Sequence, residues 1–75
     1  MPMIEVHMIE NVFTPAQKRE IVTKLTDAMV AIEGENLRPY TLVKLHDIKS
    51  GDWAVGGQQL TTEAVKDMAA RKRAA

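Results

Sequence analysis

The chain has 75 residues, and its ten Lys and Arg balance ten Asp and Glu, so the formal net charge is zero. This balance provides no long-range field that would favour nucleic acid or an anionic membrane surface. There is no cysteine, which excludes disulfides and thiolate metal sites. Two histidines that stand apart in the sequence, His7 and His46, are not expected to form a metal cluster.

A domain this small buries little of its surface by itself. Because disulfides and a structural metal are not expected, oligomerisation is the remaining source of stability. The sequence has no signal-peptide core and no apolar run of membrane-spanning length. We therefore expect a single domain over residues 1–75, cytoplasmic, with neither nucleic acid nor membrane as partner.

The first predicted element is a strand from Met3 to Ile9, preceded by Pro2. A proline is tolerated at the start of a strand because its missing N–H need not be paired there. Side chains alternate along the strand, which separates the apolar Ile4, Val6 and Met8 from the polar Glu5 and His7. The pattern predicts a strand with one apolar face.

A helix is predicted next, from Pro15 to about Glu33. Thr14 is suited to the N-cap, Pro15 to the first helical position and Gln17 to the reciprocal position of a capping box. Gly34 is the expected stop. The spacing of three and four residues predicts one apolar stripe, formed by Ile21, Val22, Leu25, Ala28, Met29 and Ile32.

The segment GENLRPY reads as a connection in which Pro39 keeps Arg38 extended. A second strand is predicted from Tyr40 to Ile48, with Thr41, Val43 and Leu45 on one face and Leu42, Lys44 and His46 on the other. Two strands joined through a helix of this length form a βαβ unit with parallel strands and a right-handed connection.

The segment KSGDWAVGG places three glycines around Trp53, which predicts a turn or short hairpin. A short helix is expected from about Thr61 to Arg73, and its apolar positions are Leu60, Ala64, Val65 and Met68. The basic run Arg71–Arg73 is interpreted as a solvated tail.

One face of a two-stranded sheet stays uncovered in a single βαβ unit, and here that face carries Leu42 and Ile48. Pairing two units edge to edge gives a four-stranded sheet with the helices on one side, and such dimers can bury their remaining faces against each other. The predicted class is α/β (α+β), with two parallel strands per subunit, a C-terminal turn or hairpin and a short helix.

Four segments together carry a resemblance to a known family. These are PMIEVHMIE, TPAQKREIVTKLTDAM, TLVKLHDI and GDWAVGG. In this order they resemble 4-oxalocrotonate tautomerase and the tautomerase superfamily over residues 2–60, with residues 61–75 as a C-terminal extension. The resemblance implies a β-α-β fold assembled as a homo-hexamer, a trimer of dimers, that needs neither a metal nor an organic cofactor.

The resemblance also implies that Pro2 is catalytic. Removal of Met1 would leave a free secondary amine at Pro2, and the family uses this amine as general base in keto-enol proton transfer. An α-amino group ordinarily titrates at about 7.7 to 8.0, and apolar neighbours such as Met3, Ile4 and Trp53 would lower that value toward neutrality. The implied substrate is a small 2-hydroxy-dienoate or enol-pyruvate acid, reacting by a 1,3- or 1,5-shift.

The expected substrate-binding residues differ from the family pattern. Trp53 stands where the family has a phenylalanine that lines the active site, whereas the family's two carboxylate-binding arginines fall on Val12 and Leu42. Neither residue recognises a carboxylate through paired hydrogen bonds. Arg38 from the preceding loop and His46 from the face of Leu42 are candidate replacements. Their alternative interpretations are a solvated loop charge and a structural histidine, which are the commoner roles of such residues.

Two alternatives remain beside the tautomerase hypothesis. The same proline, protonated, assists hydration or dehalogenation of unsaturated acids in some members of the superfamily. A second alternative is an oligomeric binding module that keeps the scaffold but has little chemistry, which the neutral Val12 and Leu42 would fit.

Overall fold

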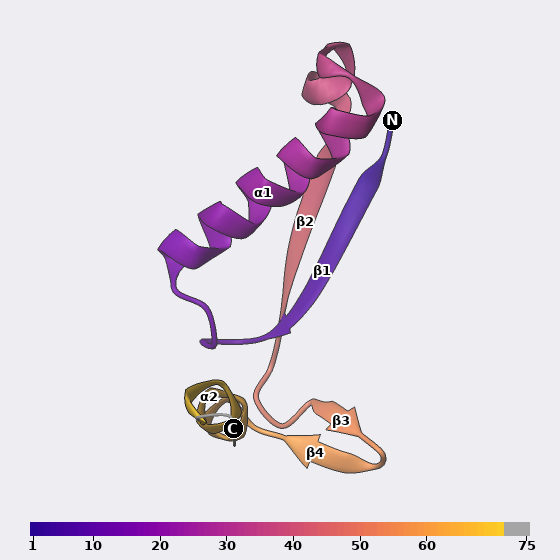
Figure 1. Cartoon of the computed structure of the whole chain (residues 1–75). Coiled ribbons are helices and arrows are strands. Elements are labelled where there is room, and N and C mark those ends of the chain that lie inside the picture. The colour runs from indigo at the N-terminus through magenta and orange to yellow at the C-terminus, as the bar shows by residue number, and fades with distance from the viewer. Residues whose placement is uncertain (72–75) are drawn as a thin grey trace. The chain divides into compact units, whose positions relative to one another are not determined.

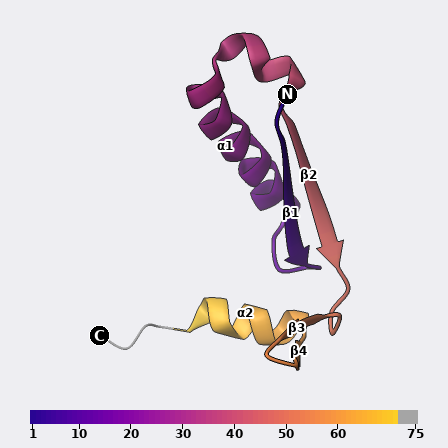
Figure 2. The same ribbon diagram turned by 90° about the vertical axis from the view of Figure 1, so that its right-hand side faces the viewer.

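The computed structural model describes residues 1–71 and is built on two adjacent parallel strands, β1 (Met3–Ile9) and β2 (Leu42–Ile48) (Figure 1). They are joined through α1 (Pro15–Glu33), which lies along one face of the strand pair in both views (Figures 1 and 2). The predicted βαβ unit is confirmed, and β1 has the predicted bounds.

Contacts divide the chain into two units. The first comprises Met1–His7 with Phe13–His46, and the second comprises Met8–Val12 with the described part of Asp47–Ala75. The first unit therefore holds α1 with most of β1 and β2, and the second holds the chain that follows each strand.

Local signals set the ends of α1 as predicted. The Thr14 N–H donates to Gln17 Oε1 at 2.9 Å, and the Gln17 N–H donates to Thr14 Oγ1 at 3.1 Å, which completes a capping box. At the other end Gly34 has a φ of 102°, and its N–H donates to the carbonyl of Val30 at 2.8 Å. Both ends of the helix thus satisfy backbone groups that would otherwise lack partners.

The connection after α1 differs from the prediction. Residues Glu35–Tyr40 form a 3₁₀ helix, η1, so Arg38 is not extended and β2 begins at Leu42 instead of Tyr40. The spacing of three residues in a 3₁₀ helix places Glu35 directly beside Arg38. Their side chains pair twice, with Arg38 Nε 2.8 Å from Glu35 Oε2 and Arg38 Nη2 3.1 Å from Glu35 Oε1. This pairing offsets the preference for extended backbone before Pro39.

Exposure alternates along β1 and β2. Ile4 and Val6, and on β2 Val43 and Leu45, are half-buried, as expected for the face that α1 covers. The opposite face, which we call the open face, carries Met3, Glu5, His7, Leu42, Lys44 and His46. On it Met3 is 52% exposed and Leu42 is 47% exposed, so a single chain leaves apolar surface on this side of the sheet.

The second unit contains the hairpin that was one of the two predicted forms of the glycine-rich segment. Strands β3 (Trp53–Val55) and β4 (Gln58–Leu60) pair antiparallel, with Trp53 opposite Leu60. Gly56 and Gly57 form the two-residue turn with φ values of 57° and 81°. Positive φ at both central positions is the requirement of the tight hairpin turn that matches strand twist.

The last described helix, α2 (Thr62–Ala70), is capped by Thr61, whose Oγ1 accepts from the Ala64 N–H at 3.1 Å. It ends before Arg71, earlier than the predicted Arg73, and residues 72–75 lie outside the described chain. Within residues 1–71 no helix is both long and apolar enough to cross a membrane.

Thr62 ties the second unit together. This residue is 6% exposed, and its Oγ1 donates to the carbonyl of Glu10 at 2.7 Å, while its backbone N–H donates to Ser50 Oγ at 2.9 Å. The Ser50 N–H donates in turn to Glu10 Oε1 at 3.2 Å. These bonds connect the segment after β1, the segment after β2 and the first turn of α2.

Candidate active site

Pro2 is held against the start of β2. It lies just before β1, is half-buried, and accepts a hydrogen bond from the Leu42 N–H to its carbonyl at 3.1 Å. The bond continues the parallel ladder to the residue before the start of β1, and the proline nitrogen takes no part in it. The structure thus brings together two of the predicted site residues, Pro2 and Leu42.

Arg38 lies at the same end of the first unit. The N-terminus is beside the end of η1 in both views, and η1 carries Arg38 four residues ahead of Leu42 (Figures 1 and 2). Its guanidinium is engaged by two carboxylates, those of Glu35 and of Asp27, the latter at 2.9 Å from Nη1. Arg38 would have to leave these partners to bind a substrate.

The same contacts shift the ionisation of the pair. The hydrogen bond to Arg38 lowers the pKa of Glu35, and the hydrogen bonds to Glu35 and then Asp27 raise the pKa of Arg38. The groups are exposed, so solvent screens these interactions and the pair is only weakly stabilising.

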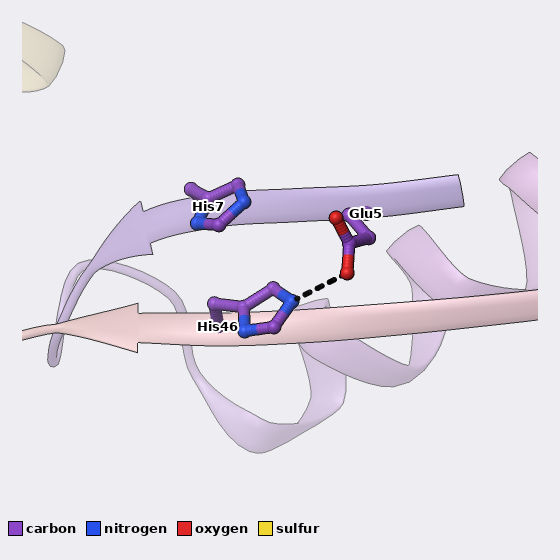
Figure 3. Close-up of side chains that lie close together, drawn as sticks. All are labelled: Glu5, His7 and His46. Atoms are coloured by element: carbon purple, nitrogen blue, oxygen red, sulfur yellow. Dashed lines mark ion pairs between the residues drawn. The ribbon is translucent and has the colours of Figure 1, made fainter. Parts of the chain in front are cut away.

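His46 lies on β2, four residues beyond Leu42 and away from Pro2. At 3.2 to 3.4 Å per residue it stands about 13 Å from Leu42, the residue beside Pro2. Its ring instead stacks on that of His7, with centroids 4.4 Å apart and planes 9° from parallel. His46 Nε2 is 3.4 Å from Glu5 Oε1 (Figure 3).

The two histidines, 39 positions apart in the sequence, therefore lie side by side in the fold. The Leu42–Pro2 bond sets Leu42 opposite Met3, and because parallel strands advance together, His46 falls opposite His7. The signal in the sequence was the shared polar face of Glu5 and His7 on one strand and His46 on the other, but the register was needed to align them.

Lys44 lies between these two places on the open face. It is two residues, about 7 Å, from Leu42 along β2. It is exposed, and no ion pair links it to another residue in the described part of the chain. The ammonium group of Lys44 is thus available to bind an anion, whereas the guanidinium group of Arg38 is already paired with two carboxylates.

Trp53 and Val12, which the family resemblance aligns with site positions, belong to the second unit. Trp53 is the first residue of β3 and is half-buried opposite Leu60. Val12 is half-buried in the segment after β1, next to Asn11, whose φ of 62° is positive.

Comparison with known proteins finds a family match over most of the chain. The model of a family described as "Tautomerase enzyme" matches residues 2–63. A protein from Dickeya dadantii (strain 3937) that is named as a probable tautomerase is 25% identical over 61 residues, which is 81% of this chain and 90% of that protein.

Solved structures agree with this match. One described among the 4-oxalocrotonate tautomerase isozymes of Methylibium petroleiphilum is 29% identical, with a TM-score of 0.67 over 85% of this chain and 97% of that one. Another homologue of 4-oxalocrotonate tautomerase, YwhB, is 29% identical with a TM-score of 0.69, over 77% of this chain and 92% of that one. With the β-α-β fold and the position of Pro2 before β1, these matches show that the chain belongs to the tautomerase family.

Proposed function

We propose that this chain is a cofactor-independent tautomerase in which Pro2, freed by removal of Met1, is the general base. One observation carries the proposal: the Leu42 N–H holds the Pro2 carbonyl at 3.1 Å in a tautomerase-family fold. This bond fixes the position of Pro2 at the end of the sheet through its carbonyl alone, so removal of Met1 would leave the proline nitrogen as a free amine at that position.

The proposed reaction moves one proton. The neutral amine takes the proton from the hydroxyl of an enol as the carbonyl forms, and the resulting ammonium gives a proton to carbon C3, or to C5 in a dienol. The substrate gains no atom and loses none, and the amine returns to its starting state. An amine whose pKa lies near the working pH performs both halves efficiently.

The surroundings of Pro2 favour a substrate with one carboxylate. Leu42, next to the base, is neutral, and Arg38 is held by Asp27 and Glu35. We assign the carboxylate to Lys44, the free cation of the open face. A single ammonium offers a point charge and not the paired donors that select a second carboxylate.

A homo-oligomer is part of this proposal. The open face exposes Met3 and Leu42, and each of these side chains stabilises the assembly if a second copy covers it. The hexamer implied by the family resemblance, and the role of Trp53 in lining its active site, stay predictions. Sedimentation velocity measures the mass of the assembly directly.

The test is the ketonisation of phenylenolpyruvate followed by ultraviolet absorbance. We expect the wild type to accelerate it, and Pro2→Ala to lose at least about 10²-fold, the range that a general base supplies. Pro15→Ala removes a proline at the first turn of α1 and is the matched control that should keep wild-type activity.

Other outcomes separate the alternatives. Rates equal to buffer on every enol, with folding confirmed by circular dichroism, would favour the binding module. Release of halide from a 3-haloacrylate without enol ketonisation would favour the hydratase and dehalogenase alternative.

A further inference from the structure

We propose that Glu5, His7 and His46 form a binding site for one divalent transition-metal ion on the open face of the sheet. Their potential ligand atoms all lie within 4.8 Å of one another (Figure 3). The proposal does not rest on the tautomerase chemistry, in which none of the three residues is assigned a role. His46 lies about 13 Å along β2 from Leu42, the residue that holds Pro2, whereas Glu5 stands opposite Lys44, the proposed carboxylate anchor.

The donor set favours a particular class of ion. Two imidazole nitrogens and one carboxylate oxygen suit Zn²⁺, Ni²⁺, Co²⁺ and Cu²⁺, whereas Mg²⁺ and Ca²⁺ prefer oxygen ligands alone. The chain contains two histidines and no cysteine, and both histidines stand at this one point of the sheet. Both imidazole side chains of the chain, the nitrogen ligands that transition metals prefer, therefore lie at this site.

The paired strands fix the backbone positions of the three residues. Glu5 and His7 are two residues apart on β1 and so project from the same face, and His46 projects beside them from the neighbouring β2. Because backbone pairing fixes all three Cα positions, closing the site requires only side-chain rotation. The loss of conformational entropy on binding is correspondingly small.

One ring nitrogen of His46 lacks a hydrogen bond. Its Nε2 atom is covered from solvent and makes no hydrogen bond, although the carboxylate of Glu5 is 3.4 Å away. A covered polar atom that makes no hydrogen bond is destabilising. A metal ion shared between His46 Nε2 and the Glu5 carboxylate would satisfy the nitrogen lone pair and the negative charge together.

Binding requires the stacked rings to move. Bonds of about 2.0 to 2.1 Å to nitrogen and oxygen bring tetrahedral ligand atoms to roughly 3.3 Å from one another, closer than the present spread. A histidine lone pair lies in the ring plane, so two rings only 9° from parallel cannot both aim at one ion. One ring must turn out of the stack, and the partly exposed side chains of His46 and Glu5 leave room for this.

Three ligands from one chain leave at least one coordination position for water. The ion would thus be exchangeable, and a chelator would remove it.

The experiment is a calorimetric titration of untagged, chelator-treated wild-type protein with ZnCl₂, repeated with CoCl₂ while the visible absorption of Co²⁺ is recorded. We expect one ion per chain and a Co²⁺ spectrum that indicates mixed nitrogen and oxygen ligation. His7→Gln and His46→Gln should each weaken Zn²⁺ binding by at least the roughly 10- to 100-fold that loss of a supporting residue costs. Glu5→Gln should weaken it as well.

Glu63→Gln is the matched control, since it removes an exposed carboxylate from α2 and should leave Zn²⁺ affinity unchanged. A second measurement avoids variants altogether. In the wild type, Zn²⁺ should shift the imidazole proton resonances of both histidines together, and affinity should fall at acidic pH because only neutral imidazole binds metal.

The proposal is overturned by the absence of saturable Zn²⁺ binding to folded wild type, or by wild-type affinity in His46→Gln. One ion per two chains would also contradict it, because the ligands would then come from different copies.

Discussion

The backbone N–H of Leu42 donates to the carbonyl oxygen of Pro2 at 3.1 Å. Leu42 is thus placed directly beside the proposed base, and this residue of the open face is 47% exposed. The family resemblance aligns this position with an arginine that binds a substrate carboxylate. A neutral residue at this point should therefore affect which acids bind more than whether the proton moves.

Leu42→Arg should improve the use of a dicarboxylate. A charge-assisted hydrogen bond contributes about 1.5 to 3 kcal/mol, so KM for 2-hydroxymuconate should fall by at least about tenfold relative to Leu42→Gln. Leu42→Gln controls for the loss of the apolar side chain. If both variants have the same KM, Leu42 does not face the substrate.

Lys44→Gln tests the proposed carboxylate anchor. Loss of an interaction made equally in the ground state and the transition state raises KM and leaves kcat unchanged. We expect this pattern with phenylenolpyruvate, while Lys66→Gln, which removes an exposed charge from α2, should match the wild type. An unchanged KM in Lys44→Gln would assign the carboxylate to another cation.

Thr62→Val should destabilise the fold by about 1 to 3 kcal/mol, because it leaves the Glu10 carbonyl without its buried donor at 2.7 Å. Thr23→Val is the matched control. Its hydroxyl donates to the Arg19 carbonyl at an exposed position of α1, and its loss should change stability by less than about 0.5 kcal/mol. Urea denaturation measures both, and equal effects would show that Thr62 does not tie the second unit together.

The Arg38–Glu35 pair should make a small, pH-dependent contribution to the free energy of unfolding. The hydrogen bond from Arg38 lowers the pKa of Glu35 in the folded protein. The stabilisation is therefore fully present above the ordinary glutamate pKa of about 4.3, and it is lost as the pH falls through the lowered pKa. Arg38 stays protonated throughout, since its pKa is raised.

Melting temperatures of wild type and Glu35→Gln should consequently differ slightly at neutral pH, converge in acid, and differ less in high salt. A difference that grows in acid would contradict the assigned sign.

Sequence alone predicted the elements whose ends are set locally. The Thr14 and Gln17 side chains and Gly34 delimit α1 without help from distant residues, and Gly56 and Gly57 do the same for the hairpin. The two faces of β1 were likewise predictable, because the alternation of apolar and polar residues is a local property of the strand.

Features that depend on distant contacts were missed. The 3₁₀ helix around Arg38 is accompanied by a contact to Asp27, eleven residues away, which no local pattern reveals. The stack of His7 on His46 requires the register of β1 against β2. Pro2 as a base rests on the family resemblance, because no spacing in one chain encodes the removal of Met1.

The most direct measurement compares two synthetic forms of the protein, one beginning at Pro2 and one retaining Met1, each verified by intact mass. The two differ in whether the Pro2 nitrogen is an amine or an amide. We predict that the form beginning at Pro2 catalyses phenylenolpyruvate ketonisation and that Met1 lowers kcat/KM by at least about 10²-fold. Equal rates for the two folded forms would contradict the role of Pro2 as the base.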